Sequence, residues 1–99
     1  MSMENREVSR KKLRRLRILQ ALQLNYPQPI TEKLVSQTLS DESDLHLTTT
    51  TLRQDLDYLH ELNLIRREVE EDVWCAKLLP LGVDYLDGLG EDLNGVARP

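Results

Sequence analysis

The sequence predicts a mainly α-helical domain that carries one small β-hairpin, in the order helix, helix, helix, hairpin, helix. Three observations support this class. The apolar residues of the 99-residue chain are mostly leucine, Phe is absent and β-branched residues are few, which favours helix over an all-β fold. Leucines recur at helical spacing in the first two-thirds of the chain. Two short alternating runs then flank a polar turn, which is typical of a hairpin.

The first predicted helix covers residues 5–24 and has two different sides. Leucines at three-residue spacing form its apolar side: Leu13, Leu16 and Leu19. The opposite side carries a group of cations, here called the basic stripe: Arg10, Lys11, Arg14, Arg15 and Arg17. Beyond Ile18 the basic side continues as apolar residues, so we expect exposure early in the helix and burial all round at its end. Two prolines between residues 25 and 29 then break the helix.

The second and third predicted helices both begin after a threonine. Thr31 is a good N-cap for a short helix over residues 32–39, and Thr48 is one for a helix over residues 49–62. The third helix has an inner stripe of leucines: Leu52, Leu56, Leu59 and Leu62. Asn63 follows it at a point where the chain needs a left-handed residue, which Asn tolerates.

A β-hairpin and a last helix follow. Residues 64–69 and 73–78 alternate around an acidic turn, which predicts two paired strands. Pro80 stands at a plausible first position of a helix that reaches Leu86. The segment after it holds three of the four glycines. We therefore expect a domain over residues 1–87 and a flexible tail over residues 88–99.

Composition and motif content argue against several classes of protein. No apolar run approaches the roughly 18 residues of a membrane helix. A single cysteine allows no intrachain disulfide, so we expect a cytoplasmic protein. His46, His60 and Cys75 share no metal-ligand spacing, and there is no glycine-rich phosphate loop. We expect no metal, no cofactor and no enzymatic activity.

Three helices followed by a two-stranded wing are the arrangement of the winged helix-turn-helix. Residues 50–65 resemble the recognition-helix segment of winged-helix bacterial regulators, T-x-x-R-D-L-x-x-L-x-x-x-G-L-I, with Asn63 at the glycine position. Residues 78–86 resemble the L-T-x-x-G-x-x-Y-L signature that follows the wing, but Leu79 replaces the Thr and removes a side-chain N-cap. The resemblance covers residues 13–86, and it implies a winged-helix fold and raises the expectation of DNA binding.

The chain also resembles small proteins of Mu-like tailed phages. The shared features are an I-L-x-x-L start at residues 18–22, an extended gap before the third helix and a Gly-Val-x-Arg-Pro-like end at residues 95–99. This resemblance implies a winged helix and a phage protein in the host cytoplasm, but it brings no established activity.

Polar residues on the third helix lie away from its leucines and are candidates for DNA readout: Thr49, Thr50, Arg53 and Gln54. In a major groove, Arg53 can pair with guanine and Gln54 with adenine, while the threonines touch phosphates or thymine methyl groups. The competing interpretation is that residues 48–51 only cap the helix, and that Arg53 pairs with Asp57 on a solvated surface.

Charge is distributed unevenly along the chain. Residues 1–20 carry seven Lys or Arg against two Glu, whereas residues 21–99 carry six Lys or Arg against fifteen acids. The basic stripe can neutralise DNA phosphates, which makes binding salt-dependent. It can equally contact the acidic body of a second subunit, or simply face water.

The start of the wing carries two further cations, Arg66 and Arg67. One of them can touch the DNA backbone, but Glu68 and Glu70 can pair with them equally well. We expect Trp74 in the core or at a dimer contact rather than as a platform for base stacking, since the chain has too few aromatic residues for a stacking surface.

Two features oppose DNA binding. Residues 40–47 separate the second and third helices, where about three or four residues are usual, and the wing tip at residues 70–72 is acidic. We expect a homodimeric regulator of transcription that reads double-stranded DNA with residues 49–62 and holds its backbone with residues 10–17. The alternative is a non-catalytic module for protein contact, a phage accessory or assembly protein that uses its acidic wing and body.

Overall fold

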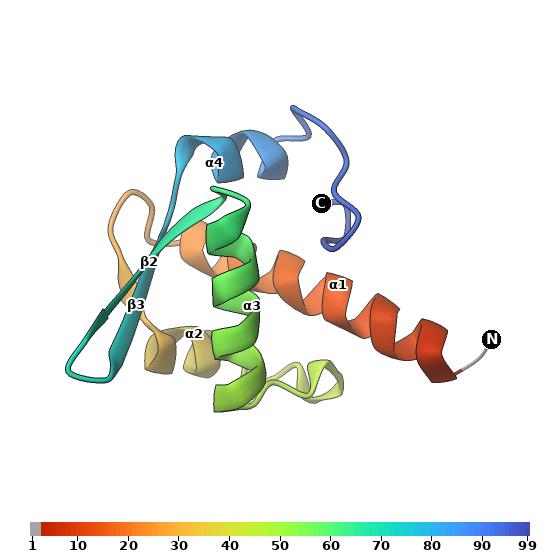
Figure 1. Cartoon of the computed structure of the whole chain (residues 1–99), viewed down its shortest axis with the longest axis horizontal. Coiled ribbons are helices and arrows are strands. Elements are labelled where there is room, and N and C mark those ends of the chain that lie inside the picture. Colours follow the sequence, from red (N-terminus) through yellow and green to blue (C-terminus); the bar gives the residue numbers. More distant parts are fainter. Residues whose placement is uncertain (1–2) are drawn as a thin grey trace.

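The computed structural model describes residues 3–99, in which four α-helices pack with a three-stranded antiparallel sheet (Figure 1). In chain order the elements are α1 (Met3–Gln23), β1 (Ile30–Thr31), α2 (Glu32–Thr38), the 3-10 turn η1 (Ser43–Leu45), α3 (Thr49–Glu61), β2 (Ile65–Glu70), β3 (Val73–Leu78) and α4 (Pro80–Leu86). The predicted order of helices and hairpin is confirmed. Residues 1 and 2 of the expected domain lie outside the described residues. No helix between residues 3 and 99 has the length and apolar content needed to cross a membrane.

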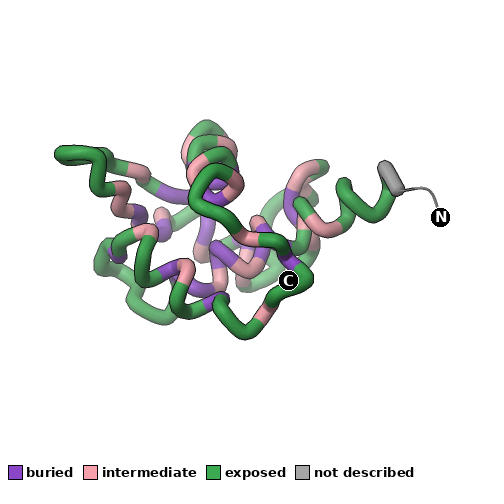
Figure 2. The backbone as a smooth tube through the Cα atoms, turned by 90° about the horizontal axis from the view of Figure 1, so that it is seen from below, coloured by how far each residue is buried: buried purple, intermediate pink, exposed green. Residues whose placement is uncertain are grey.

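α1 changes character along its length. Its first half extends away from the rest of the molecule and is mostly exposed (Figure 2). Its second half buries Leu16, Ile18, Leu19, Ala21 and Leu22. The expectation of burial all round is wrong on one side, because Arg17, Gln20 and Gln23 are not buried. Leu13 is 36% exposed, so the predicted apolar side is buried only from the next turn onward.

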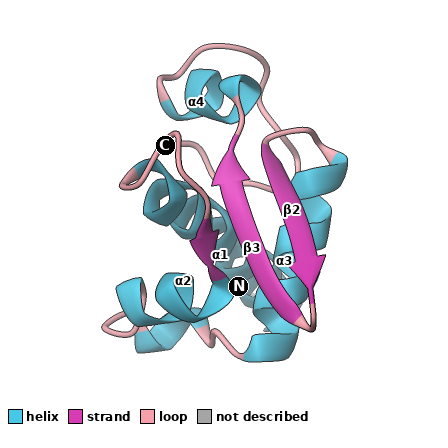
Figure 3. Cartoon of the chain, turned by 90° about the vertical axis from the view of Figure 1, so that its left-hand side faces the viewer, coloured by secondary structure: helices cyan, strands magenta, loops and turns pink. Residues whose placement is uncertain are grey.

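The sheet contains a strand that the sequence does not predict. β1 has only two residues, and it pairs with β3 so that Ile30 lies opposite Ala76 and Thr31 opposite Cys75. β3 therefore lies between β1 and β2 (Figure 3). Two residues are too few to show a period of two, so only their pairing with a distant strand makes them a strand. The sequence accordingly predicts no more than an extended connection there.

Both predicted N-caps are confirmed. The Oγ1 atom of Thr31 accepts a hydrogen bond from the backbone N–H of Leu34 at 3.2 Å. Thr48 and Thr51 form a reciprocal capping box at the start of α3. Each cap satisfies backbone N–H groups that have no partner inside the helix.

The end of α3 confirms the predicted left-handed residue. Asn63 has φ of 61°. Its N–H donates to the carbonyl of His60 at 3.0 Å, and the N–H of Leu64 donates to the carbonyl of Leu59 at 3.2 Å. This is the pair of bonds that defines a Schellman motif, and it turns the chain directly from α3 into β2.

The hairpin turn is tighter than predicted. β2 runs to Glu70 and β3 starts at Val73, so Glu71 and Asp72 alone form the loop. Their φ angles are 50° and 64°, and positive φ at both positions is what a two-residue turn of type I′ requires. Glu70, Glu71 and Asp72 together are called the acidic wing tip below.

Part of the segment that the sequence predicts as a flexible tail, residues 88–99, packs against the rest of the protein. Val96 is 2% exposed and belongs to the hydrophobic core. The N–H of Ala97 donates to the carbonyl of Lys12 on α1 at 3.1 Å. The Tyr85 hydroxyl lies 3.0 Å and 2.9 Å from the carbonyl oxygens of Val96 and Ala97. Val96 and Ala97 are thus bound to α1 and α4. The glycines that precede them made the sequence look like a flexible tail.

Candidate nucleic-acid interface

α3 packs its leucines against the core and leaves a polar face toward solvent. Thr49, Thr50 and Gln54 are exposed on this face. The threonines that cap the helix are Thr48 and Thr51, so capping accounts for those two residues and not for Thr49 or Thr50. Three of the four candidate readout side chains are therefore accessible to a ligand.

The fourth candidate, Arg53, is held by carboxylates. Its Nε donates to Oε2 of Glu32 at 2.8 Å and its Nη2 to Oε1 of Glu32 at 2.6 Å. Its Nη1 lies 3.4 Å from Oδ1 of Asp72, and its Nη2 lies 3.2 Å from the Asp72 carbonyl oxygen. The hydrogen bond with Glu32 raises the pKa of Arg53, which stays charged. The pairing of Arg53 with Asp57 in the competing interpretation is wrong, because Asp57 instead pairs with Arg67.

Trp74 of β3 lies close to two guanidinium groups. The Cζ of Arg53 is 5.0 Å and that of Arg67 is 4.9 Å from the centre of its ring, within the range of cation–π attraction. The Nε of Arg67 lies 2.9 Å from Oδ1 of Asp57. Trp74 packs against the core, as expected. These contacts connect the wing to the side of α3.

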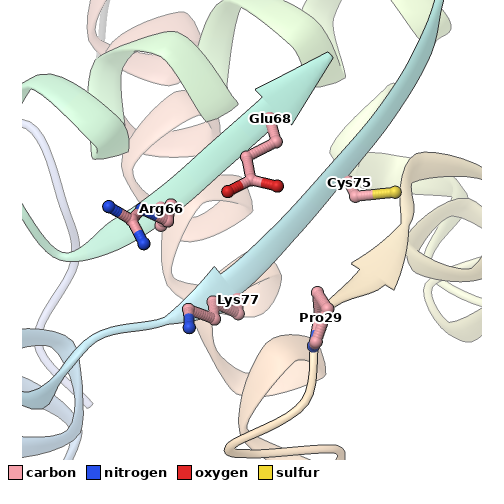
Figure 4. A pocket seen from close by; sticks show the side chains of 5 residues that line it. All are labelled: Pro29, Arg66, Glu68, Cys75 and Lys77. Atoms are coloured by element: carbon pink, nitrogen blue, oxygen red, sulfur yellow. The ribbon is translucent and has the colours of Figure 1, made fainter. Parts of the chain in front are cut away.

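Arg66 and Arg67 point to opposite faces of the sheet, because successive residues of a strand alternate. Arg67 faces α3, whereas Arg66 is exposed on the outer face (Figure 4). There it lines a shallow pocket together with Pro29, Glu68, Cys75 and Lys77. Of the two arginines, only Arg66 lies on the outer side of the wing, and it does not belong to the surface that carries Gln54.

The basic stripe is not a continuous exposed surface. Arg14 is 6% exposed, and its Nε donates to Oδ2 of Asp55 at 2.5 Å. The Nε of Arg15 donates to Oδ1 of the same carboxylate at 3.0 Å. Asp55 itself is 1% exposed. The assignment of Arg14 and Arg15 to phosphate contact is corrected, because both guanidinium groups are enclosed within the protein by a carboxylate of α3.

Arg15 also contacts two other parts of the chain. Its Cζ lies 3.7 Å from the ring centre of Tyr58 on α3. Its Nη1 donates to the carbonyl oxygen of Gly95 at 3.1 Å. Arg15 therefore links α1, α3 and the segment after α4.

The rest of the basic stripe lies at the surface. Lys11 is exposed. Arg10 pairs with Glu7 at 2.5 Å, and Arg17 pairs with Glu42 at 3.0 Å. Exposed pairs of this kind contribute about 1 kcal/mol or less, so a phosphate can displace their acids at little cost. Lys11, Arg10 and Arg17 thus stay available to a polyanion.

Asp55 is the structural residue that the sequence analysis missed. It stands three positions after Leu52 and directly before Leu56, so its place in the helical repeat is on the leucine side. A charged residue inside an apolar stripe is buried with a partner, because an unpaired buried charge is very costly. The position of Asp55 within the leucine stripe is therefore the sequence signal for a buried ion pair. Its partners are Arg14 and Arg15 of α1.

Within residues 3–99, no three or more His, Cys, Asp or Glu side chains are placed to hold a metal ion. Comparison with protein-family models, with characterised proteins and with solved structures finds no match for this chain.

Proposed function

We propose that the chain is a winged-helix protein that binds double-stranded DNA with α3. The connectivity supports this: a short strand precedes α2, α3 leads into a hairpin, and the first strand joins the hairpin as an edge. In winged-helix proteins the third helix enters the major groove beside the wing. The α2–α3 connection, which includes η1, is longer than in most helix-turn-helix proteins, but buried Leu45 anchors it.

The observation that carries the proposal is the free polar face of α3. Thr49, Thr50 and Gln54 are exposed on one side of a helix whose other side is fixed in the core. Gln54 has the amide that recognises adenine through two hydrogen bonds, and such a pair is worth about 1–3 kcal/mol of discrimination. The hydroxyl groups of Thr49 and Thr50 suit phosphate oxygens.

Backbone contact is assigned to the cations that the structure leaves accessible. They are Lys11, Arg10 and Arg17, with Lys33 added on α2, which packs against α3. Arg66 is left out of this set, because it lies on the outer face of the sheet. This is a small set, so we expect modest affinity for a single chain. Pairing of two chains in a homodimer doubles the set. A regulator of transcription in a bacterial or phage-infected cytoplasm is the role that this arrangement favours.

The test is binding of a labelled random duplex by fluorescence anisotropy, first at low salt and then at increasing salt. We expect saturable binding that weakens as salt rises. Lys11→Ala should reduce the slope of log affinity against log salt by about 1, because one phosphate contact is lost. Gln54→Ala should leave the salt slope unchanged and reduce preference among duplexes of different sequence.

The matched control for Gln54→Ala is Gln23→Ala, since Gln23 is also an exposed helical glutamine but lies at the end of α1. It should alter neither affinity nor preference. Absence of any duplex binding at low salt would overturn the proposal.

A second candidate function is protein contact through the acidic wing tip. The observation that favours it is that Glu70, Glu71 and Asp72 are all exposed. Such a surface suits a basic partner and repels phosphate. In that case a basic peptide should bind the chain, the double substitution Glu70→Gln and Glu71→Gln should weaken that binding, and duplex DNA should not compete.

A further inference from the structure

Arg53 is the one readout candidate whose hydrogen-bond donors are already occupied. Glu32 receives two of its N–H groups at 2.8 Å and 2.6 Å, and Asp72 lies along another edge at 3.4 Å. The Trp74 ring lies 5.0 Å from its Cζ. The guanidinium is therefore fixed in position by two carboxylates and an aromatic ring.

The groups of DNA that Arg53 would bind need the same N–H donors of its guanidinium. Guanine presents two acceptors, O6 and N7, to the fork of an arginine side chain, and a phosphate presents two oxygens in similar geometry. The carboxylate of Glu32 fills this fork in the same bidentate way. Glu32 occupies the edge formed by Nε and Nη2, and Asp72 lies along the edge formed by Nη1 and Nη2. A nucleic acid therefore competes with a carboxylate at either edge of the guanidinium.

We propose that Glu32 and Asp72 form a carboxylate clamp that withholds Arg53 from nucleic acid in the free protein, and that Arg53 must leave Glu32 before it binds DNA. This inference rests on the proposed function and adds its regulation. The clamp makes the duplex affinity of the free chain depend on Thr49, Thr50 and Gln54. Arg53 then adds its contact only after the exchange.

Glu32 is the stronger half of the clamp. It follows the N-cap Thr31 as the first residue of α2, so its backbone is held by a capped helix. Its side chain is 17% exposed, whereas that of Asp72 is 86% exposed. Exposed and longer contacts are screened by water and contribute less. We therefore expect removal of the Glu32 charge to open the clamp, and removal of the Asp72 charge to loosen it.

The experiment compares duplex binding at low salt by the wild type, Glu32→Gln, Arg53→Ala and the double variant. Glu32→Gln should tighten binding about tenfold or more, the range expected when a competing charged hydrogen bond is lost. Arg53→Ala alone should change affinity little. In the Glu32→Gln background, Arg53→Ala should remove the whole gain. Asp72→Asn, at an exposed turn position where Asn accepts positive φ, should give a smaller gain.

The control is Glu91→Gln, which removes the same charge from an exposed residue in the segment after α4. Equal tightening by Glu91→Gln and Glu32→Gln would mean that net charge alone sets affinity, and it would overturn the clamp. Duplexes made only of A·T pairs distinguish the two sources of acceptor. A gain confined to duplexes with G·C pairs identifies the guanine edge, and a gain on both kinds identifies phosphate.

Failure of the clamp and failure of the proposed function give different results. A wild type that binds duplex, together with a Glu32→Gln variant of equal affinity, overturns the clamp and leaves DNA binding in place. Lack of binding by every variant overturns both. Circular dichroism of each variant confirms that the fold is retained, and Asp72→Asn keeps the test decisive if Glu32→Gln does not fold.

Discussion

Asp55 of α3 and Arg14 of α1 form an ion pair inside the protein, with the Nε of Arg14 2.5 Å from Oδ2 and the carboxylate 1% exposed. Arg15 binds the other carboxylate oxygen at 3.0 Å. Two cations thus share one buried anion. The arrangement fixes the helix that carries the exposed polar face to the longest helix of the chain, so it governs the direction in which that face points.

Asp55→Ala should be strongly destabilising. Removal of one partner of a buried pair leaves the other charge uncompensated, and this typically costs about 3–5 kcal/mol. Urea unfolding followed by circular dichroism measures the change. The control is Asp57→Ala, whose side chain is 52% exposed in its pair with Arg67, and which should cost about 1 kcal/mol or less. Equal stability of the two variants would contradict the assignment.

Tyr85→Phe should loosen the segment after α4. The phenol oxygen of Tyr85 lies within 3.0 Å of the carbonyl oxygens of Val96 and Ala97. A net loss of about 0.5–1.5 kcal/mol is expected for a hydrogen bond removed in this way. Amide hydrogen exchange at Ala97 should accelerate in the variant. The control Tyr26→Phe changes a residue that is 44% exposed, and it should leave exchange at Ala97 unchanged.

The contribution of Tyr85 should also depend on pH. Burial raises the pKa of Tyr85, so its folded pKa lies above the unfolded value of about 10. The stabilisation is therefore complete below about pH 10 and is lost as pH rises toward the folded pKa. The difference in unfolding free energy between wild type and Tyr85→Phe should shrink above that pH. A difference in unfolding free energy that grows above about pH 10 would contradict a raised pKa of Tyr85 in the folded protein.

Gly82→Ala should destabilise α4 despite the better helix propensity of alanine. A Cβ at Gly82 would overlap the carbonyl oxygen of Leu64 and crowd the side chain of Leu78. Propensity favours the change by about 1 kcal/mol, but forced displacement of packed groups costs about 1–3 kcal/mol. We expect a net loss in thermal unfolding. Asp84→Ala, on the exposed side of the same helix, should cause little change.

Substitutions of Asn63 test the left-handed turn between α3 and β2. Its φ of 61° is unfavourable for residues with a Cβ by about 1–2 kcal/mol, although Asn is more tolerant than most. Asn63→Gly should therefore raise the melting temperature, and Asn63→Ala should lower it. The two variants differ only by a methyl group, so each serves as the other's control. A melting temperature that is higher for Asn63→Ala than for Asn63→Gly would contradict the account.

Local signals in the sequence were sufficient for the helices and the hairpin. Thr31 and Thr48 mark helix starts, Asn63 marks an end, and the leucine spacing of α3 identifies its buried side, all through contacts within a few residues. Each of these predictions is confirmed. They depend on hydrogen bonds and periodicity that a short window of sequence contains.

Long-range contacts account for what the sequence did not predict. β1 exists only through pairing with β3, and Val96 is buried only because the chain returns to α1. Long-range contacts changed the candidate interface most. The sequence alone predicts Arg14 as part of a basic surface and Arg53 as free, whereas in the structure Arg14 pairs with Asp55 and Arg53 with Glu32. The charges were visible, but their partners lie 41 and 21 residues away.

One guanidinium, that of Arg15, contacts both Asp55 and the carbonyl oxygen of Gly95. During synthesis on the ribosome, α1 and α3 leave the exit tunnel well before residue 95 does. The nascent chain therefore holds Arg15 without the Gly95 acceptor until residue 95 has itself left the tunnel. Final packing of the helices should follow translation of this segment rather than accompany it.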